Sequence, residues 1–198
     1  MPGTNPVVNA QSLFCERGER VLFEDLSFVV EAGEVLQIEG PNGSGKTTLL
    51  RALAGLFADY EGQIVWRAGA RCLFMGHKPA VRDTLTVIEN LRWLLELAEI
   101  RCEDSAIATA LAATGLAGYE DTLAAELSAG QTRRIGLARL YLPAPGVWLL
   151  DEPLAAIDHA GVARIGRRVD AHVREGGSVV LTTHQPIPLE AEVRRIVL

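Results

Sequence analysis

The sequence predicts an α/β fold in which helices cover a mostly parallel sheet. The first observation is an alternation of apolar, strand-like runs with helix-forming segments over residues 129–198, which is typical of parallel sheets. The second is a glycine-rich loop at residues 40–47, placed between a strand-like run and a helix-forming run. The third is a helical stretch at about residues 80–130, which predicts a helical subdomain inserted in the core. The chain has 198 residues, 48% of them hydrophobic, so we expect one domain over residues 1–198.

The elements follow from apolar periodicity and turn residues. Residues 7–39 predict several short strands with turns between them, and Thr86 and Glu89 form a capping-box pattern that opens a helix. A second helix over 105–113 is ended by Gly115 and Gly118. The remaining predicted elements are strands at 62–66, 71–75, 147–150, 178–182 and 193–198 and helices at 129–142 and 159–174.

The loop Gly40-Pro41-Asn42-Gly43-Ser44-Gly45-Lys46-Thr47 matches the phosphate-binding pattern GxxxxGK[ST]. Its glycines let successive backbone N–H groups point into one concavity, and the following helix adds its positive end. Lys46 can reach the β- and γ-phosphates, and the Thr47 hydroxyl can bind Mg²⁺. Thr48 completes the predicted nucleotide-contacting segment.

A second candidate anion site is Leu127-Ser128-Ala129-Gly130-Gln131, which opens a helix. The Ser128 hydroxyl, the Gly130 N–H and the helix N-terminus could together bind a phosphate, with Gln131 beside them. The alternative interpretation is that Ser128 only caps the helix.

Two more segments supply candidate catalytic groups. The apolar run Val147–Leu150 would place Asp151 and Glu152 at the carboxyl end of a buried strand, where ligands bind in α/β sheets. Asp151 could then bind Mg²⁺ and Glu152 could act as a general base on water, although a buried acidic pair can also be an ion-pair element. Another strand ends in His184, a position that taken alone is usually structural. We expect His159 and His172 to be surface residues.

In this order, the motifs resemble those of the ATP-binding-cassette (ABC) ATPases over nearly the whole chain. The resemblance implies an ABC nucleotide-binding domain of the P-loop NTPase class, with an antiparallel N-terminal β-subdomain and with ATP and Mg²⁺ as ligands. It implies a dimer in which Ser128, Gly130 and Gln131 of one copy cover the ATP of the other. It makes His184 the switch histidine, Glu152 and Lys46 catalytic, and Asp158 a D-loop residue at the dimer seam.

The chain departs from the ABC pattern at three positions. Ala129 replaces a signature glycine, which is a tolerated change, and His77 stands where a Gln usually contacts Mg²⁺. Because imidazole is a poor ligand for Mg²⁺, we expect His77 to contact nucleotide or metal through water and to report on a membrane partner. Arg17 stands where an aromatic side chain usually stacks on adenine, and its guanidinium plane can stack on a base. We expect the nearby Phe14 to be a core residue.

Short segments narrow the resemblance to the ATP-binding subunits of the cytochrome c maturation system, which are haem-exporter ATPases. These segments are Cys15-Glu16-Arg17, Gln37-Ile38-Glu39-Gly40 and Gly76-His77-Lys78-Pro79. The resemblance implies an integral membrane subunit as partner, a homodimer of ATPase chains, and a peripheral location on the cytoplasmic face of a bacterial inner membrane. ATP hydrolysis there supports release of a haem-loaded chaperone.

Three alternative functions fit the sequence to different degrees. An ABC transporter of another substrate would share every catalytic residue. A soluble ABC protein acting on DNA or ribosomes is disfavoured by the net charge of −6, the single cassette and the short interval of about fifty residues before Leu127, so we expect no nucleic acid partner. A phosphate-loop kinase does not explain residues 127–131. The start, residues 1–6, lacks the features of a signal peptide, and the three cysteines have no metal-binding spacing.

Overall fold

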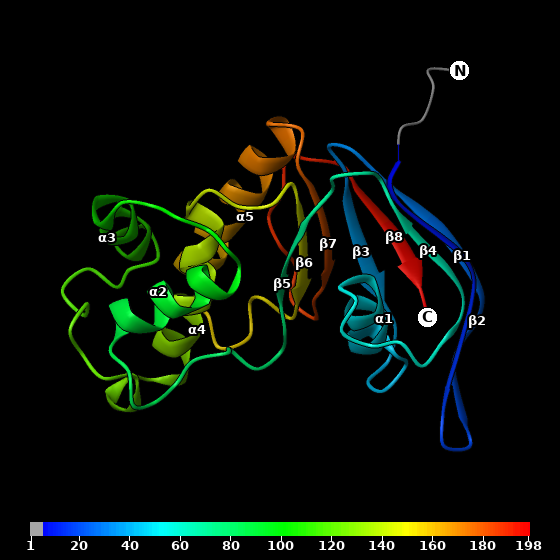
Figure 1. The fold of residues 1–198 in the computed structure, drawn as a ribbon, viewed down its shortest axis with the longest axis horizontal. Helices are drawn as coiled ribbons and strands as arrows, with labels where there is room; N and C mark the ends of the chain where they lie inside the picture. Colours follow the sequence, from blue (N-terminus) through cyan, green and yellow to red (C-terminus); the bar gives the residue numbers. More distant parts are fainter. Residues whose placement is uncertain (1–5) are drawn as a thin grey trace.

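The computed structural model describes residues 6–198, which form two β-sheets and a separate group of helices (Figure 1). Residues 1–5 lie outside the described part. They include most of the segment, residues 1–6, that lacks the features of a signal peptide. The smaller sheet has the order β2-β1-β4 and the larger one β5-β6-β7-β3-β8. Every neighbouring pair in the larger sheet is parallel, and the pairs in the smaller sheet are antiparallel. The predicted α/β class is confirmed.

The antiparallel sheet consists of β1 (Pro6–Arg17), β2 (Arg20–Glu31) and β4 (Glu61–Trp66). Our expectation of several short strands was wrong, because the first two strands each run for 12 residues. The pairing of β1 with β2 contains register shifts, and Ser12 and Asp25 have positive φ angles of 45° and 44°. Irregularities of this kind let a strand pair continue across polar positions that look like breaks in the sequence.

The parallel sheet carries the nucleotide-binding motifs at the carboxyl ends of its strands. Helix α1 (Lys46–Leu53) buries Leu49, Leu50 and Leu53 in an apolar cluster that it shares with strands of both sheets. Helix α5 (His159–Arg174) packs on the other face, against Trp148 and Leu150. The strands of this sheet are β3 (Val35–Glu39), β5 (Cys72–Met75), β6 (Val147–Asp151), β7 (Ser178–Thr182) and β8 (Val193–Val197).

Three helices, α2 (Val87–Leu97), α3 (Asp104–Ala113) and α4 (Ala129–Ala138), gather at the end of the molecule opposite the antiparallel sheet (Figure 1). They have an apolar cluster of their own. The predicted capping box is confirmed, since the Thr86 hydroxyl accepts a hydrogen bond from the Glu89 N–H. The limits of the insert, at about residues 80–130, stay a prediction. No helix within residues 6–198 is long and apolar enough to span a membrane.

Helix α4 is shorter than predicted, because its last turn tightens into a 3₁₀ helix, η2 (Arg139–Tyr141), before Pro143. The expectation for His172 was also wrong: only 6% of this residue is exposed. It lies one helical turn after the buried Val169 and therefore on the apolar face of α5. His159, at the first position of the same helix, is exposed as predicted.

Candidate nucleotide site

A cavity of about 670 Å³ lies beside the glycine-rich loop, at the carboxyl ends of β6 and β7. It brings together residues from the loop, α1, the segment after β5, and the segments after β6 and β7. Its lining residues are Arg17, Leu22, Asn42, Gly43, Gly45, Lys46, Thr47, Thr48, His77, Asp151, Glu152, Leu154, Ala155, His184 and Gln185. Seven of the residues that we expected to contact nucleotide do not line it: Gly40, Pro41 and Ser44 of the loop, and Ser128, Gly130, Gln131 and Asp158.

The loop presents helix N–H groups that have no side-chain acceptor. Gly45 is the N-cap of α1, with φ of 105° and no side-chain capping hydrogen bond, and the first turn contains no acidic residue. Gly40 has φ of 144°, and a Cβ atom there would lie 2.6 Å from the Ser44 Oγ. The loop conformation therefore depends on glycine at these positions. Free N–H groups at a helix N-terminus favour an anion.

Lys46 folds back over this loop. Its Nζ donates hydrogen bonds to the carbonyl oxygens of Gly40, at 2.7 Å, and Pro41, at 2.9 Å. Within residues 6–198, no carboxylate forms an ion pair with Lys46. The loop thus combines an ammonium charge with free backbone donors, which suits a phosphate group.

Asp151 is buried at the end of β6, and both of its carboxylate oxygens accept hydrogen bonds from hydroxyl groups. The Thr47 Oγ1 donates to Oδ2 and the Thr182 Oγ1 donates to Oδ1, each at 2.9 Å. Thr47 and Asp151, the two predicted metal ligands, are therefore in contact, and both offer the hard oxygen atoms that suit Mg²⁺. Thr182 was missed in the sequence. A polar residue that ends a buried strand next to β6 could have indicated it.

Glu152 and His184 lie together at the carboxyl ends of β6 and β7. The His184 N–H donates to the Glu152 Oε2 at 3.2 Å, and the His184 Nε2 lies 3.5 Å from Oε1. The Oε1 atom is buried and has no hydrogen-bond partner among residues 6–198, so it is an available acceptor for a donor such as water. Glu152 has a positive φ of 50°, an uncommon conformation for a non-glycine residue.

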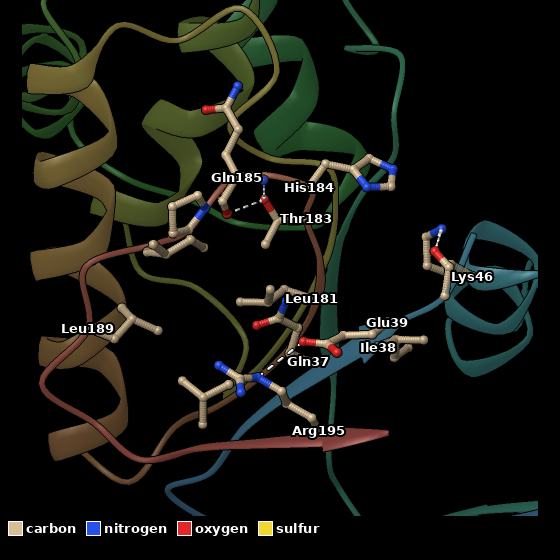
Figure 2. A pocket seen from close by; sticks show the side chains of 14 residues that line it. Gln37, Ile38, Glu39, Lys46, Leu181, Thr183, His184, Gln185, Leu189 and Arg195 are labelled. Atoms are coloured by element: carbon tan, nitrogen blue, oxygen red, sulfur yellow. Dashed lines mark hydrogen bonds and ion pairs between the residues drawn. The ribbon is translucent and has the colours of Figure 1, made fainter. Parts of the chain in front are cut away.

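A turn after β7 presents His184. The Thr183 hydroxyl donates to the Gln185 carbonyl at 2.8 Å and accepts from the Gln185 N–H at 3.0 Å. Figure 2 shows this turn above a second cavity of about 420 Å³, whose floor carries an ion pair between Glu39 and Arg195 at 3.1 Å. Lys46 and His184 line both cavities, so the two spaces adjoin.

The signature residues form helix caps within this chain. The Ser128 Oγ accepts from the Gln131 N–H at 3.3 Å, and the Gln131 side chain accepts from the Ser128 N–H at 2.9 Å. Asp158 caps α5 by accepting from the Gly161 N–H at 2.8 Å. That hydrogen bond, together with the Arg134 charge, holds the pKa of Asp158 below its ordinary value. These contacts agree with the capping interpretation, and a role toward a second copy stays a prediction.

The two unusual positions, Arg17 and His77, both line the nucleotide cavity and are exposed. Arg17 is the last residue of β1. Phe14, which we expected in the core, is only half-buried and belongs neither to the buried core residues nor to the cavity lining. The roles of Arg17 and His77 toward a nucleotide stay predictions.

Comparisons with known proteins agree with this geometry. The ABC transporter family matches residues 23–155. The chain is 48% identical to the "Cytochrome c biogenesis ATP-binding export protein CcmA" of Tatumella citrea, over 96% of this chain and 94% of that protein. It is 47% identical to the protein of the same name from Salmonella typhi, over 97% of each chain.

Solved structures agree on the fold. A "Putative ABC transporter (ATP-binding protein)" from Pyrococcus furiosus matches with a TM-score of 0.81 and 23% identity, over 96% of each chain. A second structure, the "ATP binding subunit of ABC transporter", matches with a TM-score of 0.78 over 90% of this chain and 79% of that one. From the family match and the relatives that it resembles over almost its full length, the chain belongs to the ATP-binding proteins of the ABC transporter family.

Proposed function

We propose that this chain is the ATP-hydrolysing subunit of an ABC complex for haem export and cytochrome c maturation. The observation that carries the proposal is the identity of 47–48% to CcmA proteins over more than nine tenths of both chains. The cavity that holds Lys46, Asp151, Glu152 and His184 supplies groups suited to ATP hydrolysis.

Hydrolysis rests on Glu152 and His184. The free, buried Oε1 of Glu152 accepts a proton from the attacking water, and His184, which is in contact with Glu152, orients that water and the γ-phosphate. Lys46 leaves its loop carbonyls and neutralises the β- and γ-phosphates, while the N–H groups of α1 bind phosphate oxygens. Thr47 and Asp151 would hold a magnesium ion, which would supply positive charge beside the phosphate oxygens.

Two copies close around two ATP molecules. Because Ser128, Gly130, Gln131 and Asp158 lie away from the nucleotide cavity of their own chain, a second copy is needed to bring this set to a nucleotide. The exposed Asp158 lies at the seam between the copies. Closure moves the group of α2, α3 and α4 relative to the parallel sheet.

The partner is an integral membrane subunit, and the chain is peripheral on the cytoplasmic face of the inner membrane. A cavity of about 580 Å³ between α1, the segment after β5, α2 and α4 is the place where a helix of that subunit docks. His77 lines both this cavity and the nucleotide cavity, so it reports on the partner's position. Through this contact, ATP-driven closure leads to release of the haem-loaded chaperone.

Cells that carry the Glu152→Gln form as their only copy test the proposal. We expect haem staining to show loss of covalently bound haem in c-type cytochromes, while b-type haem proteins stay intact. The matched control is Glu19→Gln, because Glu19 is exposed in the turn between β1 and β2, and it should leave the staining unchanged. Normal c-type cytochromes in the Glu152→Gln cells would contradict the haem role and would mean that this ABC protein serves another transported substrate.

A further inference from the structure

Arg133 is a buried arginine in the signature helix, one turn after Ala129. It is 3% exposed, although it lies in a helix that starts at the molecular surface. It lies four residues before the buried Leu137 and therefore on the same face of α4. A charged side chain on an apolar face is unusual and requires hydrogen-bond partners.

Those partners are backbone carbonyl groups of two loops of the nucleotide site. The guanidinium donates to three consecutive carbonyls at the end of β6: Asp151 at 3.0 Å, Pro153 at 3.4 Å, and Glu152 between them. It also donates to the carbonyl of His77. One side chain thus connects α4, the segment after β5 and the end of β6.

The electrostatic setting favours this arrangement. Burial lowers the pKa of the Arg133 guanidinium, and the nearby charges of Asp151 and Glu152 act in the opposite direction. Within residues 6–198, no carboxylate forms an ion pair with Arg133. Carbonyl groups therefore satisfy its donors directly, and the planar fork of an arginine can bind several of them at once.

The carbonyls that Arg133 binds surround the backbone of Glu152, which has the uncommon φ of 50°. On its other side, the Glu152 N–H donates to the Thr182 Oγ1 at 3.0 Å and to the Thr182 carbonyl at 3.2 Å. A non-glycine residue keeps such a conformation only when its surroundings hold it there. Thr182 and Arg133 together supply these restraints.

We propose that Arg133 is a positioning residue that sets the direction of the Glu152 carboxylate and makes it depend on the positions of α4 and of the His77 segment. This inference rests on the proposed role of Glu152 as general base. When α4 or the His77 carbonyl moves, the guanidinium moves the carbonyls on both sides of Glu152. The arginine thereby links the signature helix, and the cavity of about 580 Å³ proposed for the membrane subunit, to the catalytic group.

The test compares ATP turnover of Arg133→Gln and Arg133→Lys in the complex purified through a tag on this chain. We expect Arg133→Gln to lower kcat roughly tenfold to a hundredfold, since small displacements of a catalytic group have effects of this size. The KM for ATP should change by less than about twofold, because the loop and α1 supply the phosphate contacts. Arg133→Lys keeps the charge with fewer donors and should restore part of kcat.

Arg167→Gln is the matched control, because Arg167 is exposed on α5 and should leave both constants unchanged. A kcat within about twofold of the parent in Arg133→Gln, or an equal loss in Arg133→Lys and Arg133→Gln, would overturn the inference. So would a rise in KM that accounts for the whole loss. If Arg133→Gln does not fold, the kcat of Arg133→Lys decides the test. A kcat clearly below the parent value supports the inference, and a kcat equal to the parent value overturns it. Full turnover of Glu152→Gln would instead overturn the role of Glu152 and, with it, this inference.

Discussion

The Trp148 and His172 rings stack with their centroids 3.7 Å apart and their planes 6° from parallel. Trp148 comes from strand β6 of the parallel sheet and His172 from α5, so the stack joins the sheet to the helix that covers it. The His172 Nε2 also lies 3.1 Å from the Gly146 carbonyl oxygen. The imidazole is thus a core group.

This stack predicts a loss of stability in mild acid. Burial lowers the pKa of His172 from its ordinary 6.5, and Arg168 acts in the same direction, while the Gly146 carbonyl and Glu175 oppose it. The unfolded chain therefore takes up the proton first. The contribution of the neutral His172 side chain to stability is complete above pH 6.5. It declines as the pH falls below that value toward the folded pKa.

The variant His172→Phe keeps an aromatic ring on Trp148 and cannot titrate. The Gly146 carbonyl keeps a donor in the variant, the Ser178 N–H at 2.8 Å. We expect urea unfolding to show that the parent loses free energy of unfolding relative to His172→Phe between about pH 7.5 and pH 5.5. A difference that stays constant over this range would contradict the prediction.

Thr182 predicts a second stability effect. Replacing it with Val removes the buried donor to the Asp151 Oδ1 and one of the two acceptors of the Glu152 N–H, which keeps the carbonyl of residue 182. We expect the free energy of unfolding to fall by about 2 kcal/mol, the usual cost of leaving a buried polar group unsatisfied. The control is Thr109→Val, because Thr109 is exposed on α3 and its hydroxyl donates to a carbonyl of its own helix. Equal stabilities of the two variants would contradict this reading of Thr182.

Thr182 and Arg133 show what could not be predicted from the sequence. The phosphate loop, Asp151 and Glu152 follow from short motifs whose residues are neighbours in the chain. The Thr182 contact joins residues 31 apart in the chain, and that between Arg133 and His77 joins residues 56 apart. Such contacts depend on which strands and helices become neighbours, and residue types alone do not set this.

The antiparallel sheet shows a different limit. We expected several short strands in this region, yet β1 and β2 are each continuous over 12 residues. Polar residues at Ser12 and Asp25 take positive φ angles inside continuous strands. Irregular strands are decided by pairing across the sheet. Periodicity therefore located the apolar residues and misplaced the strand limits.

Gly130 predicts a packing effect that needs no nucleotide. A Cβ atom at this position would lie 2.7 Å from the carbonyl oxygen of Ala156, which itself has a positive φ of 61°. Because that neighbour is backbone in a tight turn, Gly130→Ala should lower the free energy of unfolding by roughly 1–3 kcal/mol without ATP present. Gly146→Ala is the control, since a Cβ atom there meets nothing within 4 Å. Unchanged thermal stability of Gly130→Ala would show that the turn yields freely.

Glu152 gives the last prediction. In Glu152→Gln the amide keeps the size of the carboxylate but cannot accept a proton from water, so we expect kcat to fall at least about a hundredfold. ATP affinity should be kept, because Lys46, the loop and α1 are unchanged. ATP then accumulates unhydrolysed between two copies. Gel filtration with Mg-ATP should show a dimer for Glu152→Gln and a monomer for the double variant that also carries Lys46→Ala. A Glu152→Gln protein that elutes only as a monomer with ATP would rule out the two-copy arrangement in which Ser128 and Gly130 cover the nucleotide.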